Sequence, residues 1–192
     1  GQAVLDILTA VRKARPDAPY LCDPVLGDDG PGLYLPEALG TLYRSRFLPM
    51  ADIATPNRFE LGWLTRQPVG TLPEMLAAAR RLCGMGPRSV FVTSVTAPPE
   101  RLGILAVTGE GAWLATCPKL SHRAAGAGDM AAALLMAHRL RGTPAPEAAA
   151  ATVAALHGVI ARAVAEGLDE LPIVTAQAAW LEPAVSAELT AL

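Results

Sequence analysis

Apolar and polar residues alternate along the chain in a pattern that predicts short strands between amphipathic helices. Runs that favour strands occupy residues 20–22, 51–55, 89–94, 103–109 and 112–117. Apolar residues at helical spacing predict helices at 2–14, 36–46, 58–65, 73–84, 129–141, 145–167 and 175–182. This order predicts an α/β sheet covered by helices, parallel in its first part. The last two strands, separated by Glu110-Gly111, predict an antiparallel hairpin.

Composition and the lack of an obvious linker predict one globular domain over residues 1–192. The 192 residues are 52% hydrophobic, which is enough to build a sizeable core. We find no internal repeat and no stretch rich in Pro, Gly or Ser that would divide the chain. We therefore treat the chain as a single unit when placing its motifs.

Charge and cysteine content exclude several classes of partner. The formal net charge is -2, with no basic stripe of the kind that follows a phosphodiester backbone, so we expect no nucleic-acid binding. The three cysteines are far apart and lack CxxC spacing, which favours a reducing cytoplasm. The most apolar segment, 147–166, is mostly alanine and is interrupted by polar residues, so we expect a packed helix and no membrane span.

Polar residues follow three of the predicted strands. Asp23 comes after 20–22, Asn57 after 51–55, and Ser94 ends 89–94. In open α/β sheets, ligands bind at the carboxyl ends of the strands. These residues therefore predict a binding site along one edge of the sheet.

The stretch Gly126-Ala127-Gly128-Asp129 precedes the predicted helix 129–141. The two glycines let the backbone turn tightly, and the first turn of the helix offers unpaired N–H groups to a phosphate. A carboxylate beside such a turn can accept the proton of an attacking hydroxyl. The alternative is that Asp129 is an ordinary helix N-cap.

Six further positions have both a chemical and a structural interpretation. Asp23 and Asp28 can face one Mg²⁺ ion that bridges nucleotide phosphates, or they can belong to a polar turn. Asn57 and Glu60 lie one helical turn apart, where they can bind cations or form a capping box. Thr93 and Ser94 supply two hydroxyls, which are also typical of a solvated turn.

Taken together, these motifs resemble one known family. The segments "YLCDPVLGDDGPGLYLPE", "LYRSRFLPMADIATPNRFELGWLT", "GPRSVFVTS" and "GAGDMAAALL" are similar to the signature segments of pyridoxal kinase, in the ribokinase-like superfamily. The resemblance covers the chain from about residue 3 to the "EPAVSAEL" tail. It implies a three-layer sandwich in which a mostly parallel sheet has helices on both faces.

The resemblance also implies a reaction and a set of site residues. The reaction is ATP-dependent phosphorylation of the 5′-hydroxymethyl of pyridoxal, pyridoxine or pyridoxamine, with Mg²⁺, possible use of a monovalent cation, and a homodimer. Asp129 matches the catalytic base, so we expect it to be both helix cap and base. Gly126 and Gly128 match the anion hole. Positions matching nucleotide contacts are Asp23, Asn57, Glu60, Thr93, Ser94, Lys119, Leu120 and Ala127. Asp28 and Glu60 match residues near the cations.

Two departures from the family pattern affect the expected activity. Ala127 stands where the family often has a threonine that offers a hydroxyl to the phosphates. The chain also begins at Gly1, without the family's first strands and much of the vitamin pocket, so it corresponds to the C-terminal, nucleotide-binding part. Because phosphoryl transfer depends on positioning and on excluding water, we expect this chain alone to be a weak or inactive kinase.

Two other functions remain open at this point. Hydroxymethylpyrimidine kinase of thiamine synthesis shares the "DPV" and "TPN" segments, although it typically has a cysteine where this chain has Asp129. A non-catalytic module that binds nucleotide or dimerises would keep the sheet but not the chemistry. ATP binding or self-association by such a module would not change in Asp129→Ala.

Overall fold

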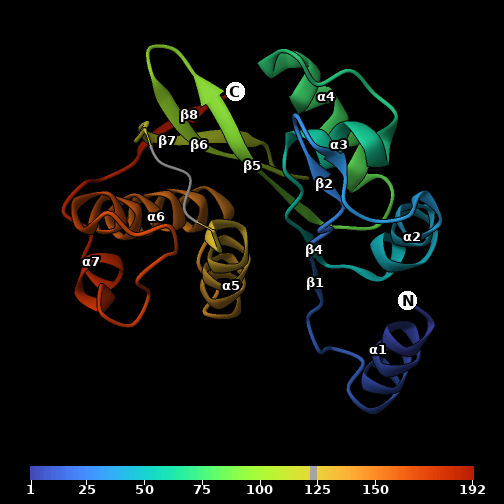
Figure 1. The fold of residues 1–192 in the computed structure, drawn as a ribbon. Coiled ribbons are helices and arrows are strands. Elements are labelled where there is room, and N and C mark those ends of the chain that lie inside the picture. The colour runs from blue at the N-terminus through green and yellow to red at the C-terminus, as the bar shows by residue number, and fades with distance from the viewer. Residues whose placement is uncertain (122–124) are drawn as a thin grey trace. The chain divides into compact units, whose positions relative to one another are not determined.

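The structure, a computed structural model, describes residues 1–121 and 125–192 (Figure 1). The chain forms two compact units, Gly1–Val90 and Phe91–Leu192. Strand β5 (Ser89–Ala97) begins in the first unit and continues in the second.

The first unit combines short parallel strands with four α-helices. Its elements in chain order are α1 (Gln2–Ala14), β1 (Leu21–Cys22), β2 (Gly27–Asp28), β3 (Gly32–Leu33), α2 (Glu37–Leu42), β4 (Ile53–Ala54), α3 (Arg58–Thr65) and α4 (Leu72–Cys83). A π-helical turn at Tyr43–Phe47 and a 3-10 turn at Leu48–Met50 follow α2. Strand β4 pairs in parallel with β1 and with the start of β5, which confirms the predicted parallel pairing.

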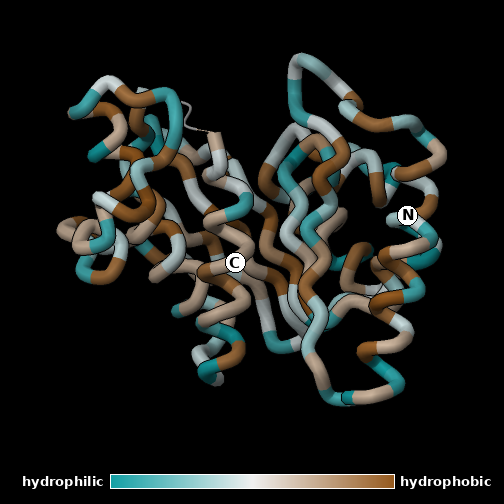
Figure 2. The backbone as a smooth tube through the Cα atoms, turned by 60° about the horizontal axis from the view of Figure 1, so that its bottom comes forward, coloured by the Kyte–Doolittle hydropathy of each residue, from teal (hydrophilic) through white to brown (hydrophobic). Residues whose placement is uncertain are grey.

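Local sequence explains where the helices of the first unit begin. Helix α3 starts with a capping box formed by Asn57 and Glu60, and α4 starts with another formed by Thr71 and Glu74. In both boxes the side chains satisfy N–H groups that the helix itself leaves unpaired. Helix α1 carries both hydrophobic and hydrophilic residues along its length (Figure 2).

The second unit has an antiparallel group of strands covered by helices. Its elements are the remainder of β5, β6 (Arg101–Thr108), β7 (Ala112–Pro118), α5 (Ala127–Leu140), α6 (Ala145–Glu166), α7 (Gln177–Leu181) and β8 (Glu188–Ala191). The predicted hairpin is confirmed, since β6 pairs antiparallel with β7. Strand β8, which the pattern of polar and apolar residues did not predict, pairs antiparallel with the other edge of β7. The sheet that we expected to be mostly parallel is therefore mixed.

Helix α6 is the central helix of the second unit. It contacts α5, α7 and the strands β6, β7 and β8, and Figure 1 shows it beside α5. Its length and apolar character would also suffice to cross a membrane. Here its buried alanines and valines pack into the core, because small side chains allow a helix to approach its neighbours closely.

Candidate functional site

In the first unit, the predicted polar residues gather around the start of α3. The Asn57 side-chain oxygen accepts a hydrogen bond from Glu60 N at 2.9 Å, and Glu60 Oε2 accepts one from Asn57 N at 2.8 Å. Asn57 Nδ2 donates to the carbonyl of Gly27 at 2.8 Å. Glu60 Oε1 accepts from Leu26 N at 2.8 Å. The pair therefore caps the helix and also holds the segment that leads into β2.

Glu60 is a carboxylate held inside the protein. Only 4% of the residue is exposed. Burial raises the pKa of its carboxyl to about 7, and the nearby charge of Asp23 adds to this rise, while the N–H donors of Asn57 and Leu26 lower it. The structure supports the capping-box interpretation, and it also keeps a carboxylate close to Asp23.

The two acidic residues of the 22–30 segment have different surroundings. Asp23 Oδ1 accepts a hydrogen bond from the hydroxyl of Thr55 at 2.7 Å, which ties the end of β1 to the end of β4. Asp28 lies in β2, which pairs with β3 in a small hairpin that we had expected to be a loop. The next residue, Asp29, forms an ion pair with Arg58 at 2.7 Å. The segment is thus fixed to the first turn of α3.

The acidic residues of this unit suit a cation that a nucleotide brings with it. In the part of the chain that the structure describes, no group of three or more His, Cys, Asp or Glu side chains could hold a metal. Mg²⁺ usually takes one or two protein carboxylates and completes its shell with phosphate oxygens and water. Asp23 and Glu60, which lie close enough to interact electrostatically, are hard oxygen donors of that kind.

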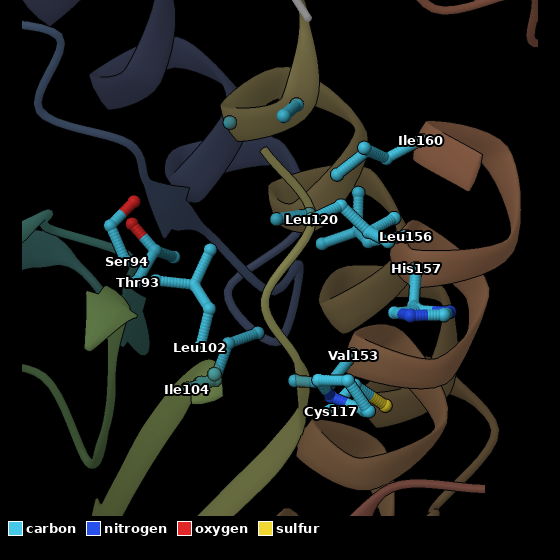
Figure 3. A pocket seen from close by; sticks show the side chains of 15 residues that line it. Thr93, Ser94, Leu102, Ile104, Cys117, Leu120, Val153, Leu156, His157 and Ile160 are labelled. Atoms are coloured by element: carbon cyan, nitrogen blue, oxygen red, sulfur yellow. The ribbon is translucent and has the colours of Figure 1, made fainter. Parts of the chain in front are cut away.

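The second unit contains a pocket of about 130 Å³, shown in Figure 3. Its walls come from β5, β6, β7, α5, α6 and the segment after β7. The lining residues are Thr93, Ser94, Leu102, Gly103, Ile104, Cys117, Pro118, Leu120, Ala127, Gly128, Ala131, Val153, Leu156, His157 and Ile160. Five residues predicted from the sequence meet here: Thr93, Ser94, Leu120, Ala127 and Gly128.

The start of α5 differs from the expected arrangement. Helix α5 begins at Ala127, with Gly126 in the N-cap position and in the left-handed conformation at φ 90. Met130 N donates to the Gly126 carbonyl at 3.0 Å, which closes the first helical turn. Asp129 is therefore in the first turn, and the expectation that it caps the helix is wrong. Its carboxylate is exposed to solvent, where a ligand can reach it.

Ser94 also differs from the prediction. We expected it at the end of a strand, but β5 continues to Ala97. Ser94 interrupts the strand with a left-handed backbone, at φ 59, which is uncommon for a residue with a side chain. Its neighbour Thr93 lines the pocket with it. Strained backbone of this kind is found most often at functional sites.

Three of the residues predicted in the second unit lie outside the lining of this pocket. Lys119 is exposed, and its N–H donates to the carbonyl of Glu100 at 2.8 Å. Gly126 is the N-cap residue of α5 and contributes its left-handed backbone conformation to the start of the helix. Asp129 lines a wider depression of about 960 Å³, together with residues of α5, α6 and the segment 173–187.

The sequence interpretation missed the wall that α6 contributes to the pocket. Val153, Leu156, His157 and Ile160 lie on one face of this helix and line the pocket. Their spacing of three and four residues was visible in the sequence. It could not be distinguished from the spacing of core residues, because α6 is apolar on most of its surface.

The chain is similar to known kinases. The family model for phosphomethylpyrimidine kinase matches residues 2–173. Pyridoxal kinase PdxY of Corynebacterium diphtheriae is 33% identical over 192 residues, which cover 98% of this chain and 68% of that protein. The chain belongs to the family of pyridoxal and phosphomethylpyrimidine kinases.

Other pyridoxal kinases extend the comparison. Pyridoxal kinase PdxY of Rubrobacter xylanophilus is 39% identical over 189 residues, which cover 96% of this chain and 65% of that protein. The chain therefore spans about two thirds of the length of this relative. Pyridoxal kinase of Leishmania donovani, solved in complex with ADP and pyridoxamine, has a TM-score of 0.89 and 29% identity, covering 98% of this chain and 69% of that one. The predicted ribokinase-like α/β fold is confirmed by this similarity.

Proposed function

We propose that the protein is a pyridoxal kinase that transfers the γ-phosphoryl group of ATP to the 5′-hydroxymethyl of pyridoxal, pyridoxine or pyridoxamine. The observation that carries the proposal is the pocket at the start of α5, which brings Thr93, Ser94, Leu120, Ala127 and Gly128 together. An apolar pocket that ends at helix N–H groups suits a nucleotide, with the base among apolar walls and phosphates at the helix. ADP and pyridoxamine in the Leishmania donovani structure support both substrates.

The chain's own residues supply three parts of the reaction. The N–H groups at the start of α5 stabilise negative charge on the transferring phosphoryl group, because a helix N-terminus carries a partial positive charge. Asp129, in the first turn and exposed, takes the proton of the attacking hydroxymethyl group. Thr93 and Ser94 offer hydroxyl groups to the phosphates.

We also propose a cation site in the first unit. Asp23, Asp28, Asn57 and Glu60 would hold Mg²⁺ and the phosphates that it accompanies, as the resemblance implies. When bound, the ion neutralises charge that develops on the phosphate oxygens. Glu60 further positions this group of residues, because it hydrogen bonds to Leu26 N and Asn57 N at once.

The same proposal includes how the protein assembles and where in the cell it works. A homodimer, an additional monovalent cation and a cytoplasmic location are typical of the proposed function. Cys22 and Cys117 are free, buried thiols. Free thiols of this kind fit a reducing compartment.

A coupled assay for pyridoxal 5′-phosphate tests the proposed function. The purified protein is incubated with ATP, Mg²⁺ and each vitamer, and product formation is compared with that from hydroxymethylpyrimidine. We expect phosphorylation of the vitamers to exceed that of the pyrimidine. A full-length pyridoxal kinase assayed in parallel provides the reference rate.

One observation favours the alternative substrate enough to keep it in the same assay. The matching family model is described as phosphomethylpyrimidine kinase and covers residues 2–173. Preference for the pyrimidine would reassign the substrate and leave the proposed phosphoryl transfer intact. ATP binding with no phosphorylation of either substrate would favour a non-catalytic nucleotide-binding module.

A further inference from the structure

His157 is an imidazole in the wall of an otherwise mostly apolar pocket. It projects from α6 on the face that also carries Val153, Leu156 and Ile160, all of which line the pocket (Figure 3). Across residues 1–121 and 125–192, its side chain has no hydrogen bond and no ion pair. A polar group placed in this way has hydrogen-bonding capacity that the fold does not use.

The pocket has two chemically different ends. Ala127 and Gly128 at the start of α5 form one end, where helix N–H groups favour anionic phosphates. Ala125 N donates to the carbonyl of Asp169, so the start of α5 lies beside the residues that follow the end of α6. Residues earlier in α6 therefore lie progressively further from the anion end.

This direction along α6 locates His157 within the pocket. Ile160 is nearer the anion end, and Val153 lies about 10 Å further along the helix axis, given a rise of about 1.5 Å per residue. Figure 3 shows His157 toward the end that Val153 and Cys117 form, with Ile160 toward the other. A nucleotide whose phosphates occupy the anion end would place its base near Val153 and His157.

The chemistry of His157 suits a base rather than a phosphate. Burial lowers the pKa of its imidazole, so the ring is neutral at pH 7 and offers one donor and one acceptor. The other polar side chain at this end is the thiol of Cys117, whose Sγ is 3.9 Å from the carbonyl oxygen of Ser186. A thiol is a weak hydrogen-bonding group, so the imidazole is the strongest partner available there for the edge of a base.

We infer that His157 recognises the nucleobase of the phosphoryl donor, through a hydrogen bond between its imidazole and the polar edge of a purine. The inference rests on the proposed function, because it uses the pocket assigned to ATP. The apolar walls bury the faces of the base, while His157 contributes orientation and selectivity. A residue with this role affects the affinity for ATP more than the rate of the chemical step.

Replacing His157 with Leu tests the inference by a direct binding measurement. Leucine suits the apolar surroundings of Val153 and Leu156, so the fold should be kept. We expect the affinity for ATP to fall about tenfold, as for the loss of one hydrogen bond in a desolvated site. The affinity for inorganic tripolyphosphate, which lacks a base, should not change. His157→Gln, which keeps a donor and an acceptor, should recover most of the ATP affinity.

A matched control uses the other described histidine of this unit. His138 lies on α5 and lines the wider depression instead of this pocket. Its pKa is also lowered by burial, with a contribution from the charge of Arg141. His138→Leu removes a partly buried imidazole without touching the pocket, so it should bind ATP as the unchanged protein does.

The outcomes separate this inference from the proposed function. If the unchanged protein binds ATP and His157→Leu binds it equally well, the inference is overturned and the kinase proposal stands. An equal loss of ATP and tripolyphosphate affinity would also overturn it, because the effect would then be general. Failure of the unchanged protein to bind ATP would overturn both. Loss of ATP affinity alone, with recovery in His157→Gln, would support the inference.

Discussion

Candidate site residues of the first unit are held by the protein itself, whereas those of the second unit face a pocket or solvent. Glu60 accepts hydrogen bonds from Leu26 N and Asn57 N, and Asp23 accepts one from Thr55. In the second unit, within the residues that the structure describes, the side chains of Thr93, Ser94 and Asp129 make no hydrogen bond. Substitutions in the first unit should therefore cost stability, and those in the second should cost binding or turnover.

The largest effect should come from Asp129, whose carboxylate is exposed and makes no hydrogen bond or ion pair with the residues that the structure describes. Asp129→Ala should lower kcat by about 10²- to 10⁴-fold, because general base catalysis contributes that much. ATP affinity and the denaturant midpoint should stay nearly constant, since the side chain is exposed and does not cap α5. Steady-state kinetics, nucleotide titration and urea unfolding measure the three quantities.

Glu147 provides a matched control for Asp129. It is an exposed acidic residue in the first turn of α6, as Asp129 is in the first turn of α5. Glu147→Ala should leave turnover unchanged. A similar loss of turnover in both variants would mean that Asp129 acts only through general electrostatics, and the contrast between the units would weaken.

Glu60 should show the opposite behaviour, with a large cost in stability. Glu60→Ala removes the acceptor for two N–H groups and should lower the free energy of unfolding by about 2–4 kcal/mol. Urea unfolding measures this value. Glu74, the corresponding residue in the exposed capping box of α4, is the control, and Glu74→Ala should cost about 1 kcal/mol or less. Equal costs would show that burial of Glu60 adds nothing.

The pH dependence of stability gives a second measure of Glu60. Its pKa is about 7 in the folded state, above the ordinary value of 4.5, so the folded state binds the proton more tightly than the unfolded state. The resulting contribution to stability is complete below about pH 4.5 and is lost as pH rises through about 7. Glu60→Gln does not titrate, so the stability of the unchanged protein relative to this variant should fall by up to about 3 kcal/mol between these limits.

The control for this measurement is Asp52, whose pKa is lowered instead of raised. Asp52 has a lowered pKa despite its partial burial, because Tyr20 N, Arg12 and Arg88 donate to its carboxylate. Its contribution is present at neutral pH and is lost as pH falls. Asp52→Asn should therefore remove stability chiefly at neutral pH. A relative stability of the Glu60 variant that does not change with pH would contradict the raised pKa.

The smallest effect should come from Ala127 in the anion-binding turn. Ala127→Thr restores the hydroxyl that the family often has at this position and that can reach the phosphates. We expect ATP affinity to rise by about two- to threefold, with little change in stability, because one exposed hydrogen bond contributes little. Ala127→Val, which has the same shape without the hydroxyl, is the control. Equal affinities for the two variants would show that the hydroxyl makes no contact.

Short-range features were the ones that the sequence predicted best. The Asn57 and Glu60 capping box and the β6–β7 hairpin each depend on residues only a few positions apart. Asp129 was placed wrongly as a cap, because the helix starts two residues earlier than the apolar pattern does. Ser94 was placed at a strand end, although β5 continues past it with a left-handed residue. Both errors concern backbone geometry that side-chain pattern alone does not specify.

By itself, the sequence determined the type and order of most elements, the family, and the residues at the start of α5 and α3, because periodicity and short motifs are local properties. Only the tertiary structure decided that α6 supplies His157 and three apolar residues to the pocket. It also decided that Glu60 is buried, with a raised pKa. Such features depend on which surfaces meet after folding, and residues far apart in the chain carry no local signal of that contact.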